Sequence, residues 1–193
     1  FPVTLFVNTD AVGTSGYLDW QQLRDVMQKG VEIGNHTASH TYLVEMEEGE
    51  SQTQWKNRIS ADIEKSKLAL KDNLGVEPDI FAYTYGEYSP AVIEVVKGAG
   101  FKAAFAQQSG VVYAGSDIWT LPRFPMGGPY ATMNGFLSKL KMSALEVFNI
   151  NPVDPVIRDQ NPPLLRLNLV DERLARGAIN CFAQGGNSCR VER

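Results

Sequence analysis

The only two histidines of the chain, His36 and His40, lie four positions apart in the segment Gly34–His40. They follow a predicted strand directly, on a loop or a first helical turn. At this spacing two imidazoles can reach one divalent cation. A catalytic zinc takes a third protein ligand, commonly a carboxylate, and keeps one position open. The spacing therefore makes His36 and His40 candidate metal ligands, while a pair of solvated or capping histidines stays open as the alternative.

A third ligand is not evident nearby. Asp10 is the only carboxylate near the end of the preceding predicted strand, Val3–Val7. Aspartate, asparagine and glycine are ordinary turn formers, so we interpret Asp10 as a loop residue.

The elements that must position these side chains alternate between strand-like and helix-like segments over the first 142 residues. Apolar β-branched runs predict strands, and apolar residues at helical spacing predict helices. The expected strands are 3–7, 31–33, 80–83 and 101–106, the expected helices are 18–29, 52–74, 90–97 and 131–142, and 116–125 is expected to be extended. This alternation predicts an α/β fold with parallel strands and a site at their carboxyl ends.

The alternation of strand-like and helix-like segments stops in the last quarter of the chain. Repeated prolines in 149–163 forbid both helix and central strand and indicate a linker. Strand-like runs follow at 164–170 and 178–182 without intervening helices. We therefore expect a main domain at 1–148 and a linker with a small β-rich appendage at 149–193.

Composition excludes several classes of protein. The 193 residues are 44% hydrophobic and 21% charged, which is typical of a globular chain and not of a disordered one. The net charge of −4 argues against binding to a nucleic-acid backbone. No apolar run approaches the ~18 residues that a membrane span needs.

Three segments carry a resemblance to a known family. Val31–His40 resembles the second motif of NodB-like polysaccharide deacetylases, carbohydrate esterase family 4. Phe1–Val7 resembles the strand before that motif, and Phe81–Gly86 resembles the third motif. The resemblance runs from residue 1 to about residue 125 and is nearest to enzymes acting on poly-N-acetylglucosamine-type exopolysaccharides. It implies a distorted (β/α) barrel in which His36 and His40 bind a divalent metal, usually zinc.

Departures from the family pattern are equally informative. The family's first motif supplies an Asp-Asp pair, the third metal ligand and the base, upstream of the strand that matches Phe1–Val7. We therefore expect a barrel that lacks its first βα unit, and position 1 to be an internal point of a longer protein. In the third motif, Ala82 and Thr84 stand where the family has Arg and Pro, whereas Tyr85 matches. The resemblance assigns the Tyr85 backbone N–H as an oxyanion donor, a role that side-chain changes leave intact. The family's late histidine, a proposed general acid, has no counterpart.

Other side chains are candidates for lesser roles. Arg123 is a plausible replacement for the missing arginine, orienting a carboxylate, although a structural salt bridge is equally open. Trp119 matches the aromatic wall of the family's fourth motif, and Tyr83, Tyr85 and Tyr88 could stack on sugar faces. Aromatic residues in such segments often only pack in the core.

The two cysteines, Cys181 and Cys189, flank a Gly-Gly-Asn turn signal, so we expect a hairpin closed by a disulfide. Two reduced thiols are the alternative. A disulfide would indicate an oxidising compartment, the bacterial periplasm or the cell exterior.

The implied function is metal-dependent removal of N-acetyl groups from an N-acetylglucosamine-containing polysaccharide. The chain without the Asp-Asp motif is expected to be a poor catalyst. A non-catalytic carbohydrate-binding protein on the same scaffold is the first alternative, and an unrelated α/β metalloprotein that shares only the histidine spacing is the second. We expect a polysaccharide partner, no nucleic acid and no membrane span, and the sequence gives no oligomeric state.

Overall fold

A computed structural model describes residues 2–157, 163–171 and 191. The chain forms two compact units, Phe1–Met142 and Ser143–Arg193. The boundary predicted at residue 148 falls inside strand β5 (Val147–Asn151), which pairs with β6 (Arg166–Leu169). The division therefore lies after Met142, because a strand groups with the partner to which it is hydrogen-bonded. The strand predicted at 178–182 and both cysteines lie outside the described residues.

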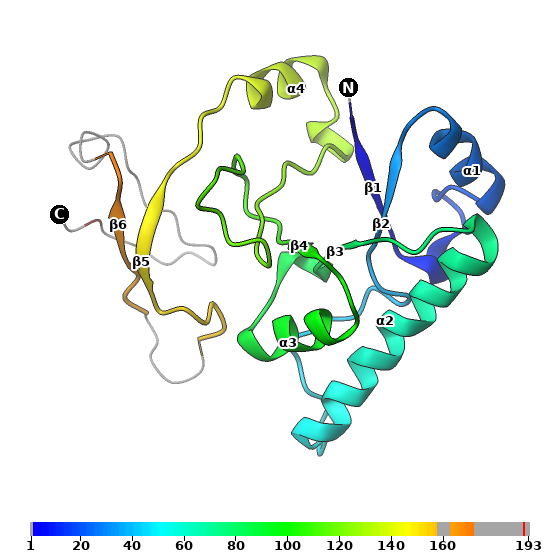
Figure 1. Cartoon of the computed structure of the whole chain (residues 1–193), viewed down its shortest axis with the longest axis horizontal. Coiled ribbons are helices and arrows are strands. Elements are labelled where there is room, and N and C mark those ends of the chain that lie inside the picture. The colour runs from blue at the N-terminus through cyan, green and yellow to red at the C-terminus, as the bar shows by residue number, and fades with distance from the viewer. Residues whose placement is uncertain (1, 158–162, 172–190, 192–193) are drawn as a thin grey trace. The chain divides into compact units, whose positions relative to one another are not determined.

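The N-terminal unit is α/β, as the alternation predicts. Its sheet has the order β1-β2-β3-β4, and all neighbouring pairs are parallel (Figure 1). The strands are β1 (Thr4–Val7), β2 (Glu32–Asn35), β3 (Ile80–Ala82) and β4 (Ala103–Phe105). Because consecutive strands are neighbours and parallel, the carboxyl ends of β1, β2 and β3 come together at one edge of the sheet.

Helices connect the strands at the places the sequence indicates. They are α1 (Trp20–Gln28), α2 (Gln52–Leu74), α3 (Pro90–Gly98) and α4 (Met133–Leu140), with 3₁₀ helices η1 (Thr9–Ala11), η2 (Thr84–Gly86) and η3 (Gly128–Tyr130). Capping boxes begin α1 at Asp19 and α2 at Ser51, and left-handed Gly75 ends α2. Ser89 caps α3 ahead of Pro90, whose missing N–H costs nothing in a first turn.

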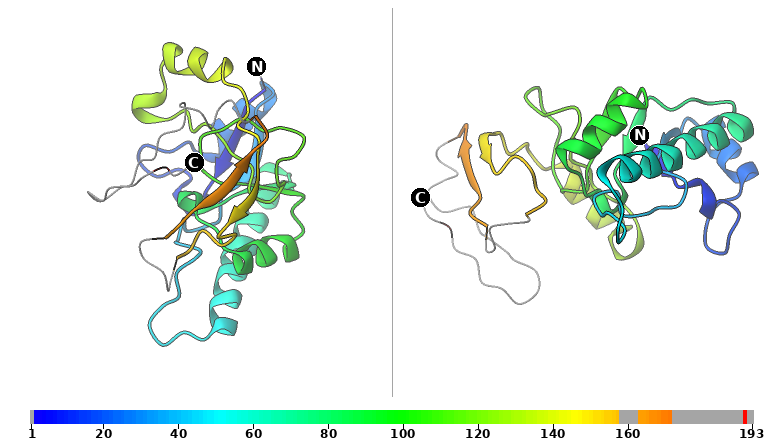
Figure 2. Two further views of the ribbon diagram at one scale, coloured as in Figure 1. Left: turned by 90° about the vertical axis from the view of Figure 1, so that its left-hand side faces the viewer. Right: turned by 90° about the horizontal axis from the view of Figure 1, so that it is seen from below.

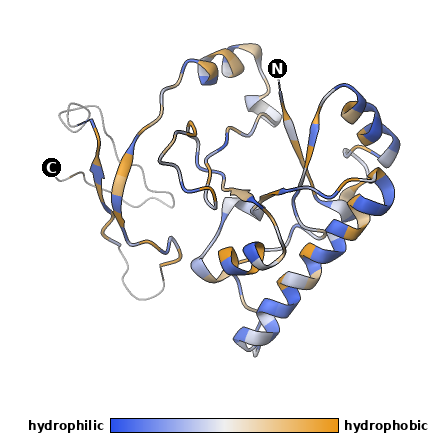
Figure 3. Ribbon diagram, in the orientation of Figure 1, coloured by the Kyte–Doolittle hydropathy of each residue, from blue (hydrophilic) through white to orange (hydrophobic). Residues whose placement is uncertain are grey.

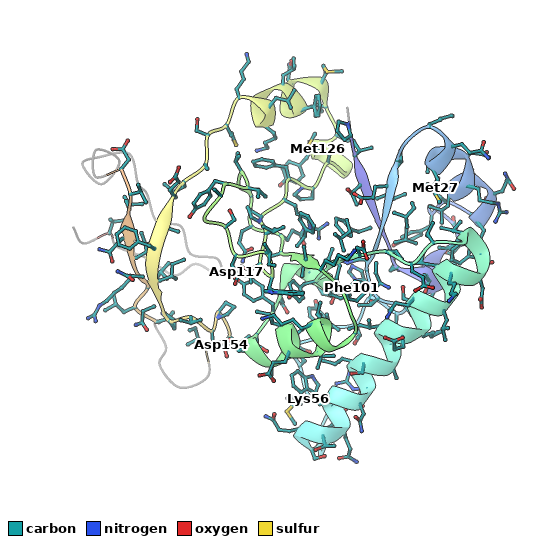
Figure 4. All side chains as sticks on the ribbon, viewed as in Figure 1. Met27, Lys56, Phe101, Asp117, Met126 and Asp154 are labelled. Atoms are coloured by element: carbon teal, nitrogen blue, oxygen red, sulfur yellow. The ribbon has the colours of Figure 1, made fainter. Side chains whose placement is uncertain are left out.

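Two apolar clusters hold the helices to the sheet. The larger joins α2, α3 and strands β3 and β4, and the smaller joins α1 and the end of α2 to β1 and β2. Hydrophilic and hydrophobic residues alternate along α2 (Figure 3), and its buried stripe includes Ile59, Ile63 and Leu70. Phe101 is buried in the larger cluster, and Lys56 of α2 pairs with Glu94 of α3 at 3.3 Å (both Phe101 and Lys56 are labelled in Figure 4).

Aromatic rings from β1 and β4 meet across the sheet. The rings of Phe6 and Phe105 lie 5.4 Å apart between centroids. Gly34 in β2 leaves room for this contact, because a Cβ there would collide with the Phe6 ring. The outer edge of β1 has no partner strand among the described residues.

In the segment predicted to be extended, 116–125, turns and bends occupy most of 116–120 and no regular structure follows at 122–125. Its one strand-like feature is a parallel bridge between Leu121 and Phe105 at the edge of β4.

In the C-terminal unit, β5 and β6 run antiparallel beside each other (Figure 2). No helix in the described part of the chain combines the length and hydropathy needed to cross a bilayer.

Candidate active site

His36 follows β2 directly and is buried at the carboxyl edge of the sheet. Its Nδ1 lies 2.7 Å from the carbonyl oxygen of Ala82 at the end of β3. A carbonyl can only accept, so Nδ1 carries the proton and Nε2 keeps its lone pair. Burial lowers the pKa of His36 to about 4, and the nearby His40 and Arg123 act in the same direction. His36 is therefore neutral at neutral pH, the form in which imidazole binds a metal.

His40 comes to His36 through a loop and not through a helical turn. The two rings lie 4.8 Å apart between centroids at an interplanar angle of 83°. No helix spans 36–40, and Thr37 and His40 both have left-handed backbone, with φ of 66° and 59°. Of the two settings that the sequence allows, the loop is the one present, and two left-handed residues turn the chain so that both rings converge.

Short side chains fix this loop from within. The Asn35 side-chain oxygen accepts from the Thr37 N–H at 2.9 Å, and the Thr37 hydroxyl accepts from the His40 N–H at 3.0 Å. From the end of β1, the Thr9 N–H donates to the Thr37 carbonyl at 3.2 Å. These bonds satisfy the backbone of the loop while it holds a left-handed conformation.

Tyr85 lies beside His40 at the end of β3. Its own backbone is left-handed, with φ of 55°, and its ring sits 4.7 Å from the His40 ring between centroids. Within the described residues, its N–H donates to no acceptor. The next residue, Gly86, also has positive φ, and a Cβ there would meet the Gln107 backbone nitrogen at 2.6 Å. The predicted donor is thus free and close to the histidines.

Tyr42 is a site residue that the sequence analysis missed. Its ring stacks on that of Tyr85 with 4.0 Å between centroids and an angle of 9°. Tyr42 is 41% exposed and Tyr85 is 44% exposed, so the pair presents aromatic surface beside His40. The only available signal was its position two residues after His40.

The remaining predicted aromatic contacts belong to the core. Tyr83 is fully buried and its hydroxyl donates to the Trp119 carbonyl at 2.9 Å, so the expected sugar contact at Tyr83 does not fit. Tyr88 is half-buried with its ring 5.5 Å from that of Tyr83. Trp119 packs against the larger cluster with the Lys97 ammonium 4.9 Å from its ring centroid. The packing alternative describes these three residues.

Arg123 is a partly buried cation near the histidines. Its Nε donates to the Ala106 carbonyl at 2.9 Å, and its guanidinium carbon lies 5.7 Å from the Phe6 ring centroid. Desolvation lowers the pKa of Arg123. In the described chain it forms no ion pair, so the salt-bridge alternative has no partner there.

Asp10 is engaged elsewhere. It lies in η1, after β1, and its carboxylate pairs with Lys65 of α2 at 2.7 Å. The described residues contain no group of three or more His, Cys, Asp or Glu side chains that could hold a metal ion. Two imidazoles, a free backbone donor and an unpaired guanidinium are therefore what the described part of the chain brings together.

The same segments match a known family. The family description "polysaccharide deacetylase" matches residues 1–104, which include both histidines and Tyr85. The chain belongs to the polysaccharide deacetylase family. This membership confirms the resemblance drawn from the motifs and removes the alternative of an unrelated metalloprotein.

Individual members of the family give the degree of similarity. The chain is 26% identical over 127 residues to the poly-beta-1,6-N-acetyl-D-glucosamine N-deacetylase of Escherichia coli K12, covering 55% of this chain and 19% of that protein. It thus spans about a fifth of the length of that curated relative.

Solved structures share the fold. A Streptococcus pyogenes deacetylase, PplD, in complex with acetate superposes with a TM-score of 0.60 at 19% identity, covering 73% of this chain and 59% of the other. A de-N-acetylase from Aggregatibacter actinomycetemcomitans gives 0.57 at 20% identity, covering 70% and 65%.

Proposed function

We propose that this chain is part of a metal-dependent polysaccharide N-deacetylase acting on a polymer of N-acetylglucosamine. The observation that carries the proposal is the close approach of the His36 and His40 rings beside the Tyr85 N–H. Neither Nε2 of His36 nor this N–H has a hydrogen-bond partner among the described residues. The Escherichia coli relative, named for poly-beta-1,6-N-acetyl-D-glucosamine, supports the substrate class.

The two imidazoles fit part of a zinc site. His36 is held in the right tautomer by the Ala82 carbonyl, and an outer partner of this kind is usual for a metal-binding histidine. His36 and His40 would hold the ion, most naturally zinc, and an anionic third ligand is needed in addition. When bound, a divalent ion supplies Lewis-acid chemistry that activates water and polarises the acetamide carbonyl.

The chain's own residues then have separable tasks. The Tyr85 N–H donates to the oxyanion that develops on the carbonyl oxygen of the acetyl group, and a fixed backbone donor is effective there because it needs no reorganisation. The Arg123 guanidinium orients a carboxylate, since it lies near His36 and forms no ion pair among the described residues. Tyr42 and Tyr85 stack on a sugar face, because they are exposed beside His40.

Two tasks, anionic ligand and general base, remain, because the described residues hold no group of three His, Cys, Asp or Glu side chains that could bind a metal ion. The Asp62 carboxylate accepts hydrogen bonds from the Ala38 and Ser39 N–H groups. We assign both tasks to an Asp-Asp strand that pairs with the open edge of β1. That strand would lengthen the parallel sheet toward the barrel expected for the family, and its carboxyl end would lie next to that of β1.

Acetate release from N-acetylglucosamine oligomers with added zinc or cobalt tests the proposal. Three proteins are compared: this chain, the chain extended upstream through an Asp-Asp strand, and the extended chain with His36→Ala. We expect activity only from the extended chain, since loss of a general base alone costs about 10²–10⁴-fold in rate. Full activity of the short chain would mean that its carboxylate lies elsewhere.

A carbohydrate-binding protein on the same scaffold is the second candidate, favoured by the exposed Tyr42–Tyr85 pair. It predicts that the extended chain binds the oligomers without releasing acetate, and that Tyr42→Ala weakens binding. Tyr113→Ala, which changes another tyrosine, serves as the matched substitution.

We also place the protein in the bacterial envelope, periplasmic or extracellular. This location rests on the proposed Cys181–Cys189 disulfide and on the exopolysaccharide substrate. Thiol titration of the unfolded, unreduced protein should find no reactive thiols, and two per chain would contradict the location.

A further inference from the structure

The carboxylate of Asp62 in α2 forms hydrogen bonds to the peptide segment between the two histidines. Its Oδ2 accepts from the Ala38 N–H at 3.2 Å, and its Oδ1 accepts from the Ser39 N–H at 3.2 Å. One carboxylate thus accepts from two consecutive amide groups, one at each oxygen, whereas an asparagine in its place would offer only one accepting oxygen. The bonds are charge-assisted and therefore stronger than those between neutral groups.

The helix that carries Asp62 is firmly seated. Ile59 and Ile63, on either side of Asp62 in α2, are fully buried in the larger cluster. One turn further, Lys65 pairs with the Asp10 carboxylate at 2.7 Å. The Asp10 N–H in turn donates to the Ala38 carbonyl at 3.0 Å. The Ala38 residue is therefore held at its N–H by α2 and at its carbonyl by η1.

These hydrogen bonds stabilise the backbone conformation that brings the His36 and His40 rings together. Thr37 and His40, which flank Ala38 and Ser39, both have left-handed backbone, a conformation that is unfavourable for residues other than glycine. The bonds from Asp62 and Asp10 act on the two residues between these positions and therefore favour the conformation that the segment adopts. Asp62 lies outside the motif that identifies the histidines, 22 positions after His40 by sequence number.

We propose that Asp62 is a positioning residue that holds the His36–His40 loop ready for the metal before the metal binds. The inference rests on the proposed function, because it presumes that these histidines take a divalent ion. Its action is through the two amide groups and not through contact with the ion. Residues of this kind commonly change metal affinity by about 10–100-fold when they are replaced.

The test uses the full chain and zinc alone as the probe. Asp62→Ala is compared with Asp62→Asn and with a matched control, Glu64→Ala. The control removes an equal charge two residues away, where the carboxylate pairs with Lys67. Zinc affinity is measured by calorimetry, amide hydrogen exchange of Ala38 and Ser39 by NMR, and the unfolding midpoint by circular dichroism. We expect Asp62→Ala to weaken zinc binding about tenfold and to speed exchange at both amides. Asp62→Asn, which keeps one acceptor, should fall between, and the midpoint should match that of the control.

Two results would overturn the inference. Equal zinc affinity in Asp62→Ala and Glu64→Ala would show that the hydrogen bonds from Asp62 do not affect zinc binding. Equal losses in Asp62→Asn and Asp62→Ala, with unchanged exchange at Ala38 and Ser39, would assign the effect to charge. His36→Ala distinguishes a failure of the proposed metal site from a failure of the role given to Asp62. If His36→Ala leaves zinc binding unchanged, the proposed metal site itself is wrong.

Discussion

Tyr85 depends for its place beside His40 on the glycine that follows it. Gly86 has φ of 75°, and a Cβ there would collide with the Cβ and backbone of Gln107 after β4. Since Gln107 meets it with backbone atoms, the clash cannot be relieved by a rotamer change. The position of the proposed oxyanion donor is thus set by contact between two chain segments.

We predict that Gly86→Ala destabilises the fold by about 1–3 kcal/mol, the usual cost of overpacking, and displaces Tyr85. Gly98→Ala is the control, because nothing lies within 4 Å of a Cβ at that last residue of α3. Alanine is favoured over glycine in a helix by up to about 1 kcal/mol, so the control should be neutral or stabilising. Urea unfolding of both variants gives the comparison, and equal midpoints would contradict the prediction.

At this scale the sequence revealed the residues whose chemistry is rare and missed those whose role depends on exposure. His36 and His40 stand out as the only imidazoles. Tyr83 and Tyr42 look alike in sequence, yet one is fully buried and the other is 41% exposed. Which side of a strand or loop meets solvent depends on packing with distant segments, and a local pattern does not contain that information.

Arg58 of α2 forms ion pairs with two residues of the loop that precedes the helix, Glu50 and, at 3.5 Å, Glu47. Arg58 donates to both carboxylate oxygens of Glu50, each at 2.8 Å, and to the Glu45 carbonyl at 3.0 Å. The hydrogen bond from Arg58 lowers the pKa of Glu50 to about 2. Folding therefore favours the ionised carboxylate, and the arginine keeps its charge throughout.

The Arg58–Glu50 pair predicts a pH dependence of stability. The contribution of Glu50 is complete above its ordinary pKa of about 4.5 and is lost as the pH falls toward 2. The difference in unfolding free energy between the wild type and Glu50→Gln should therefore shrink as the pH is lowered through that window. Glu48→Gln, which removes an equal charge in the same exposed loop, is the control. A difference that is constant with pH would mean that the pair contributes nothing through its charge.

Elements with signals at both ends were predictable from sequence. α2 spans Gln52–Leu74 in both the prediction and the structure, because the Ser51 capping box begins it and Gly75 ends it. The segment 116–125 has no such signals at its ends, and its single bridge, at Leu121, depends on where β4 lies. The boundary after Met142 was missed because the pairing of β5 with β6 joins residues far apart in sequence.

The whole molecule divides so that both buried clusters fall in the N-terminal unit, between Val7 and Ala106. We predict that a chain ending at Met142 unfolds cooperatively, with the same unfolding free energy as that unit has in the full chain. The three tryptophans, at positions 20, 55 and 119, all report on this unit by fluorescence. A broad transition, or none, would show that the C-terminal unit is needed for the fold.

The open edge of β1 also governs how this protein behaves at high concentration. Thr4–Val7 is uncharged, rich in β-forming residues and unpaired on one side in the described chain. Such an edge is a template on which strands from other copies can add. Light scattering of concentrated samples should therefore rise with time. Thr4→Lys, which places a charge at the exposed first residue of the strand, should delay that rise. We therefore expect the four residues of β1, which are not among the candidate site residues, to determine how long a concentrated sample stays free of aggregates.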